Sequence, residues 1–96
     1  MMQWKHEPLV QEHQLLYNQT ILARIQLVPV KKGGFKVVTL ISGIYFGTRL
    51  QQELERQKKQ WVAYRKKFAD REQANLYIAR KKEVVTKFVT AREKEA

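Results

Sequence analysis

The sequence predicts an α+β fold: a small antiparallel sheet, with elements in the order β-β-(α)-β-α, packed by a long C-terminal helix. Three observations lead to this class. Apolar residues alternate over 15–30 and 35–42 around a Gly-Gly turn, a third alternating segment covers 60–68, and helical spacing of apolar residues then continues for about 20 residues. A chain of 96 residues that is 44% hydrophobic and 29% charged is typical of one folded domain.

The first residues of the chain look unlike the rest. Residues 1–14 are polar and mixed, and Pro8 interrupts them. Terminal segments of this kind are poorly ordered unless packing holds them. The sequence therefore predicts a flexible or loosely docked N-terminal arm over 1–14 and a single basic α+β domain over 15–96.

Two strands are predicted after the arm. Along 15–30, alternate residues from Ile21 to Leu27 are all apolar, which predicts a strand with one firmly buried face. Gly33 and Gly34 can adopt positive φ and predict a hairpin turn. The next strand, over 35–42, is apolar on both sides. Either something covers each of its faces, or the strand pairs with another copy of the chain.

Helical signals follow. Thr48 and Gln51 match a capping box and predict a short, exposed helix over about 49–58. After the basic strand 60–68, Asp70 is the predicted N-cap of the long helix. The apolar positions of that helix recur at helical spacing and are Ala74, Tyr77, Ile78, Val85, Phe88 and Val89.

Charge is the most informative bulk property. The net charge is +10, and it is uneven: residues 1–48 carry five basic and two acidic side chains, whereas 49–96 carry fourteen and seven. Such an excess attracts phosphate polymers. The absence of cysteine excludes disulfides and thiolate-bound zinc. Since neither a membrane-length apolar run nor a signal-peptide pattern is visible, we expect a cytoplasmic protein without a membrane partner.

Nothing in the sequence predicts catalysis. The one serine, Ser42, has no nucleophile-elbow context, and the carboxylates lie among lysines and arginines, as in helix-face ion pairs. His6 and His13, flanked by glutamates, are interpreted as exposed histidines of the arm rather than metal ligands. We therefore expect a non-enzyme with no cofactor and no metal.

The strongest functional signal is the segment 58–67, in which five of ten side chains are cationic and two are aromatic. Cations release counterions from phosphates, and aromatic rings stack on unpaired bases. Strand alternation places Trp61 and Tyr64 on opposite faces, and we expect Tyr64 to be packed and Trp61 accessible. The predicted nucleic-acid-binding residues, which include two cations of the long helix, are Lys58, Lys59, Trp61, Arg65, Lys66, Lys67, Arg80 and Lys82.

The sequence thus predicts a small, basic nucleic-acid-binding domain with a regulatory role. RNA is slightly favoured over DNA, because the aromatics lie on a strand and no helix-turn-helix pattern is present. The alternative is a protein-interaction module or subunit that dimerises or docks through the apolar hairpin 35–46.

Overall fold

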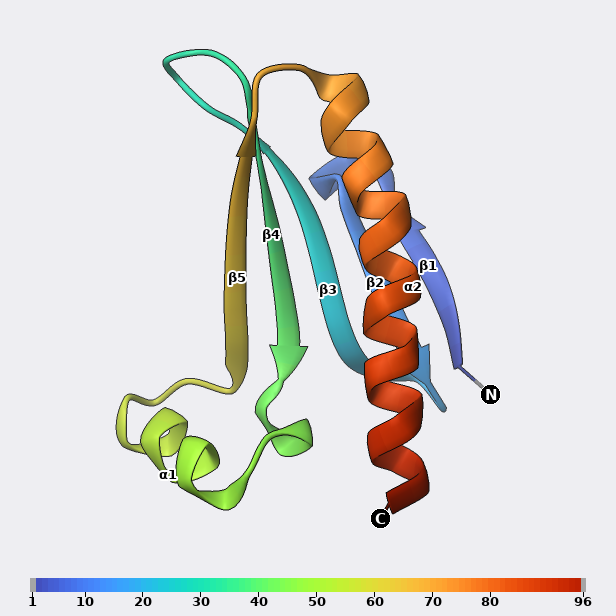
Figure 1. The fold of residues 1–96 in the computed structure, drawn as a ribbon, viewed down its shortest axis with the longest axis vertical. Helices are drawn as coiled ribbons and strands as arrows, with labels where there is room; N and C mark the ends of the chain where they lie inside the picture. Colours follow the sequence, from blue (N-terminus) through green and yellow to red (C-terminus); the bar gives the residue numbers. More distant parts are fainter. Residues whose placement is uncertain (1, 96) are drawn as a thin grey trace.

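A five-stranded antiparallel sheet and a long C-terminal helix form the fold (Figure 1). The computed structural model describes residues 2–95, and side chains over 2–93. The sheet follows chain order and consists of β1 (Met2–Glu7), β2 (Glu12–Tyr17), β3 (Thr20–Pro29), β4 (Phe35–Ser42) and β5 (Trp61–Phe68). The helices are α1 (Thr48–Arg56) and α2 (Arg71–Glu95), with short 3-10 turns at Pro8–Val10 and Gly43–Tyr45. The predicted α+β class is confirmed, with two more strands than expected.

The N-terminal arm is the main error of the sequence-based prediction. Residues 2–7 form β1, which pairs with β2 along its whole length, so this segment belongs to the sheet. The predicted strand over 15–30 is in fact two strands, because the chain reverses at Asn18 and Gln19, both with positive φ. Two-residue hairpin turns require this backbone conformation, and Asn tolerates it well.

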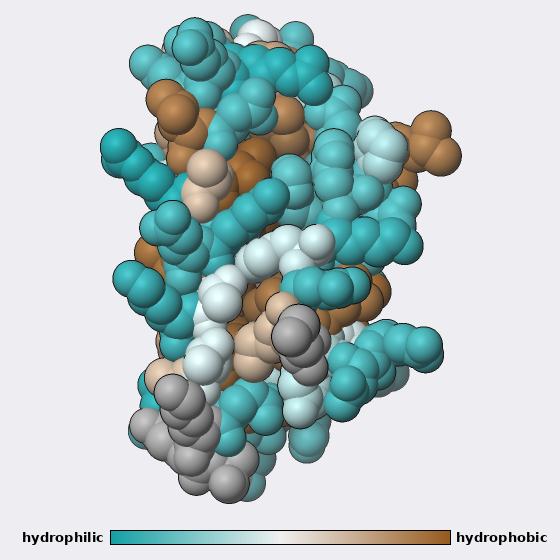
Figure 2. All heavy atoms as spheres, turned by 90° about the vertical axis from the view of Figure 1, so that its right-hand side faces the viewer, coloured by the Kyte–Doolittle hydropathy of each residue, from teal (hydrophilic) through white to brown (hydrophobic). Residues whose placement is uncertain are grey.

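One face of the sheet and one face of α2 form the core. Cross-strand partners share a face, so the pairing of Ala23 with Ile41 and of Leu27 with Val37 stacks the apolar residues of β3 and β4 under the helix. The helix contributes its predicted stripe, of which Ala74, Ile78, Val85 and Val89 are buried. Figure 1 shows α2 running along the sheet, with its C-terminal turns extending past the end of β4. The face seen from the side of α2 and β1 is largely hydrophilic, with apolar patches between (Figure 2).

Local signals explain how the elements begin and end. The predicted Gly-Gly turn joins β3 to β4, with φ of 100° at Gly33 and 82° at Gly34. The backbone amide of Gln73 donates to Oδ1 of Asp70 at 2.8 Å, which confirms Asp70 as the cap of α2. The predicted cap of α1 is wrong: its N-cap is Gly47 and Thr48 is its first helical residue.

The second face of the sheet carries no helix. Helix α2 contacts β3, β4 and β5 from one side, and α1 lies beside the turn that follows β4, at one end of the sheet. We call the opposite side the open face. It includes Val38, which is 8% exposed, and Leu40, which is half-buried, so the apolar side of β4 that was expected to need a cover is largely buried although no helix lies on it among residues 2–95. Within the same residues, no helix has the length and apolar character needed to cross a bilayer.

Candidate functional site

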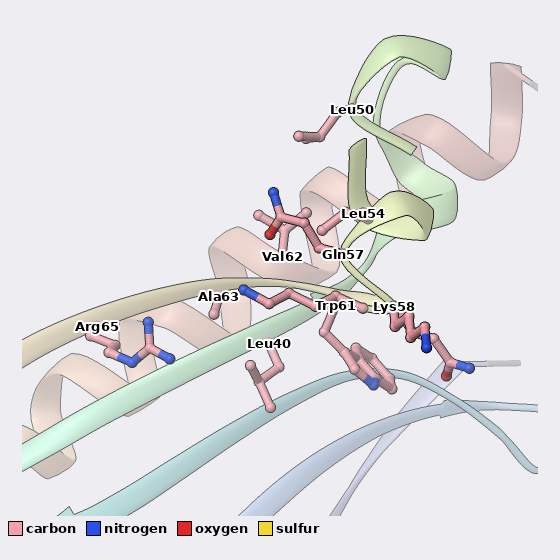
Figure 3. A pocket seen from close by; sticks show the side chains of 11 residues that line it. Leu40, Leu50, Leu54, Gln57, Lys58, Trp61, Val62, Ala63 and Arg65 are labelled. Atoms are coloured by element: carbon pink, nitrogen blue, oxygen red, sulfur yellow. The ribbon is translucent and has the colours of Figure 1, made fainter. Parts of the chain in front are cut away.

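The edge strand β5 organises the predicted binding residues. It pairs with β4 on one side only, so its other edge is unpaired within the described chain. Four of the predicted residues, Lys58, Lys59, Trp61 and Arg65, line one open cleft of about 630 Å³ between α1 and β5. Figure 3 shows the labelled side chains of this cleft, with Leu50 and Leu54 contributed by α1.

Lys67 and Lys36 extend this surface along the open face. The register places Arg65 and Lys67 on that side of β5, two residues apart, which corresponds to about 7 Å along a strand. Lys67 lies directly opposite Lys36 of β4. Like charges in such a pair destabilise a sheet. The sequence analysis missed Lys36. Strand alternation could have identified it, because Lys36 is next to Val37 and therefore points to the opposite face.

The remaining predicted cations lie elsewhere. Lys66 is on the α2 side of β5, with its Nζ 5.2 Å from the ring centroid of Tyr77. It shares a smaller hollow with Arg80. Lys82 is on the side of α2 that faces away from β5, and its Nζ lies 5.9 Å from the ring centroid of Trp4 in β1. The structure therefore does not bring Lys82 together with the cations of β5.

The two aromatic residues of β5 lie on opposite faces, as alternation predicted, but their burial is the reverse of the prediction. Tyr64 is 45% exposed, and Lys81 of α2 lies over its ring at 5.5 Å. Trp61 is half-buried on the open face. The reason is that α2 runs over the middle of the sheet and covers the side chains of the edge strand β5 only in part, whereas Trp61 packs against a neighbour on β3.

That neighbour is Arg24, whose guanidinium carbon lies 5.4 Å from the ring centroid of Trp61. Arg24 also donates to the carboxylate of Glu12, with Nη1 3.1 Å from Oε2. Glu12 is only 3% exposed and also accepts from Nε2 of Gln14 and of Gln26. A polar network therefore runs from Glu12 through Arg24 across the open face and ends at the indole of Trp61. The sequence analysis missed it, because its members are far apart in the chain.

The network controls the ionisation of Glu12. Burial by itself would raise the pKa of this carboxyl, but the hydrogen bonds from Gln14 and Gln26 and the charge of Arg24 outweigh it and hold the pKa below its ordinary value. Glu12 is therefore a carboxylate at neutral pH. It neutralises Arg24, so the cations that remain for a ligand on this face are Lys36, Arg65 and Lys67.

The β5 cations have no carboxylate partners in the part of the chain whose side chains are described. The ion pairs there are Lys5–Glu7, Arg24–Glu12 and Arg56–Glu53, and none includes a cation of 58–67. Those five cations stand within ten residues that contain no Asp or Glu. The surface around β5 consequently carries a concentrated positive charge, which an external anion can neutralise.

The histidines lie at the other edge of the sheet. His6 and His13 are cross-strand partners, with ring centroids 4.4 Å apart. Burial, with smaller effects from Lys82 and His6, lowers the pKa of His13 to about 4. His13 is thus a half-buried residue of β2 and not an exposed residue of an arm. No cluster of three or more potential metal ligands occurs among the residues described.

Comparison with known proteins gives no assignment: no family model matches the chain, and no curated protein or solved structure matches it significantly.

Proposed function

We propose that this chain is a nucleic-acid-binding protein that contacts the phosphate backbone through the cations of 58–67. The observation that carries the proposal is the concentration of five cations, without an ion-paired carboxylate, around an edge strand. Each phosphate neutralised by such a cation releases condensed counterions, which favours binding at low salt. Binding, rather than catalysis, is the activity we assign to the chain.

The pair Lys36 and Lys67 supports the same proposal. Two ammonium groups directly opposite each other on neighbouring strands repel, and a sheet gains nothing from this arrangement by itself. A phosphate bound between them would convert the repulsion into two attractions. Arg65, two residues along β5 on the same face, would contact the next phosphate of an extended strand.

A salt titration tests the proposal. Affinity for single-stranded RNA, single-stranded DNA and duplex DNA is measured by fluorescence anisotropy at two salt concentrations. We expect log K to fall with log salt with a slope of several units, about 0.7–0.9 for each phosphate contacted. Replacing Arg65 and Lys67 by Gln should weaken binding and flatten the slope by about 1–2 units.

The matched control replaces Lys31 and Lys32 by Gln. Both lie in the exposed β3–β4 turn, and their loss changes the net charge by the same amount. We expect this control to keep most of the affinity. Equal effects of the two double variants would show attraction by net charge alone, and a salt-insensitive affinity would contradict the phosphate-contact mechanism.

A protein-interaction role through 35–46 is the second candidate. It is favoured by Ile44, which is 65% exposed directly after β4, and by Leu40 on the open face. An adaptor or homodimer of this kind would not bind nucleic acid at physiological salt, and it would change its sedimentation with concentration or on adding a partner. Ile44→Asp would abolish that association and leave nucleic-acid binding unchanged.

A further inference from the structure

The cleft beside β5 differs in chemistry from a simple phosphate-binding surface. Its volume of about 630 Å³ falls within the range of about 300–1,000 Å³ that is usual for small-molecule sites. Its walls are largely apolar and are formed by residues of α1, β4 and β5, namely Leu40, Leu50, Leu54, Trp61, Val62 and Ala63. Cations stand among these walls, so the cleft combines an apolar lining with positive charge (Figure 3).

Helix α1, which forms one wall of the cleft, packs closely against the end of β4. The chain after β4 passes Gly43, which has no side chain, and a Cβ at this position would lie 2.7 Å from Cδ1 of Leu54. The amide of Gly43 also donates to the carbonyl of Gln60 at 2.9 Å, which ties the start of β5 to the end of β4. Leu50, one turn before Leu54, remains 39% exposed and lines the cleft.

Trp61 is fixed on the other side of the cleft. The guanidinium of Arg24 lies against its ring and is itself held by the buried carboxylate of Glu12. Figure 3 shows the indole extending away from α1, across the sheet. The ring is half-buried and still lines the cleft. An aromatic side chain that is already held in one orientation loses little conformational freedom when a ligand stacks on it.

The occupant of this cleft must combine an apolar, flat group with negative charge close by. An unpaired nucleobase on a phosphate chain has both properties. Its π-face can pack against Trp61, while the neighbouring phosphates reach Lys59 and Arg65 at the cleft. The bases of a duplex are stacked on each other and cannot enter without being unpaired. The shape of the cleft therefore favours a single strand, whereas its cations attract the phosphates of either form.

We propose that the cleft between α1 and β5 receives an unpaired base of a single-stranded nucleic acid, stacked on Trp61, with Lys59 and Arg65 bound to the adjacent phosphates. This inference rests on the proposed function and narrows its ligand to single strands. Stacking on one base should strengthen binding by roughly 5- to 150-fold relative to a strand without bases.

The test compares a short oligothymidylate and a short oligouridylate with an abasic deoxyribose-phosphate strand of the same length and charge. We expect both base-bearing strands to bind more tightly than the abasic strand. Trp61→Ala should remove this advantage and leave abasic binding unchanged. Tyr64→Ala is the matched control, because it removes an exposed aromatic from the other face of the same strand, and it should change the ratio of affinities by less than about twofold.

A second variant keeps the test valid if Trp61→Ala unfolds the protein. Ala63 is exposed and lines the cleft, so Ala63→Ile adds volume there without removing any core contact or charge. We expect it to reduce the advantage of the base-bearing strands. Quenching of Trp61 fluorescence by oligothymidylate, measured in a Trp4→Phe background, should be lost in parallel.

The possible results separate the two proposals. Equal affinity for base-bearing and abasic strands overturns the base site and leaves phosphate binding standing. No binding to any strand at low salt overturns both. An advantage that survives in both Trp61→Ala and Ala63→Ile would place base recognition outside the cleft. Tight binding of a polyglutamate peptide that Ala63→Ile abolishes would replace the base with an acidic protein segment as the occupant.

Discussion

Protonation of His13 should destabilise the fold between neutral and mildly acidic pH. The ring stacks on His6 of β1 and lines a hollow together with Asn75 and Ile78 of α2. Its Nδ1 is buried without a hydrogen-bond partner, and its pKa is lowered to about 4 by burial first, then by Lys82 and His6. Arg71 lines the same hollow. In the unfolded chain the pKa returns to about 6.5, so the unfolded state binds a proton that the folded state excludes.

The sign and size of the effect follow from this difference. The stabilisation that depends on neutral His13 is complete above the unfolded pKa of about 6.5 and is lost progressively as the pH falls towards 4. The full shift sets a ceiling of about 3 kcal/mol at about 1.4 kcal/mol per pKa unit. Because water reaches part of the ring, we expect about 1 kcal/mol between pH 7 and pH 5.

Thermal unfolding followed by circular dichroism measures this effect. A loss of about 1 kcal/mol should lower Tm by about 4–8 °C in a domain of this size. His13→Gln should flatten the profile between pH 5 and pH 7. His6→Gln, the matched control, should keep most of the slope, because burial is the larger cause of the shift in His13. Parallel profiles for the wild type and His13→Gln would show that His13 does not cause the pH dependence of stability.

Three further predictions concern the fold. Val85 is 1% exposed, so Val85→Asp should cost at least about 3 kcal/mol, and an unchanged melting temperature would mean that the buried face of α2 is misassigned. Gly34→Ala should lower the free energy of unfolding in urea by about 1–3 kcal/mol, because φ is +82° and the added Cβ would lie 2.5 Å from the carbonyl oxygen of Phe68. The control is Gly33→Ala, whose added Cβ would meet no atom within 4 Å. Equal stability of the two variants would contradict the close approach at Gly34. Asp70→Ala should cost about 1 kcal/mol through loss of the α2 cap, and Asp70→Asn should restore most of it.

Sequence reasoning worked best where a pattern is local. The strand 35–42 and the strand near 60–68 were recognised from their alternation, and α2 from its apolar spacing and the cap at Asp70. These signals are properties of neighbouring residues and do not depend on what packs against them. The prediction failed at the N-terminus, because β1 has few apolar residues and gains its stability from pairing with β2. The missed turn at Asn18 and Gln19 joined two strands into one.

The candidate site was only partly predictable. The cationic segment 58–67 could be recognised from composition, and alternation placed Trp61 and Tyr64 on opposite faces. Which of the two is covered depended on where α2 crosses one face of the sheet and on the packing of Arg24 on the other face, and no local pattern reports either. Glu12, Arg24 and Lys36 joined the open face through pairing between strands distant in the chain.

The class of the fold, the buried stripe of α2 and the excess of positive charge near β5 can all be predicted from the chain alone, because they depend on periodicity and composition among neighbouring residues. Three relations depend on how the elements pack: a buried Glu12 neutralises Arg24, Lys36 faces Lys67, and Lys82 lies apart from the cations of β5. Strand register and helix placement set these relations. A shift of one residue in register would turn every side chain of a strand to the other face, and with it the whole composition of the binding surface.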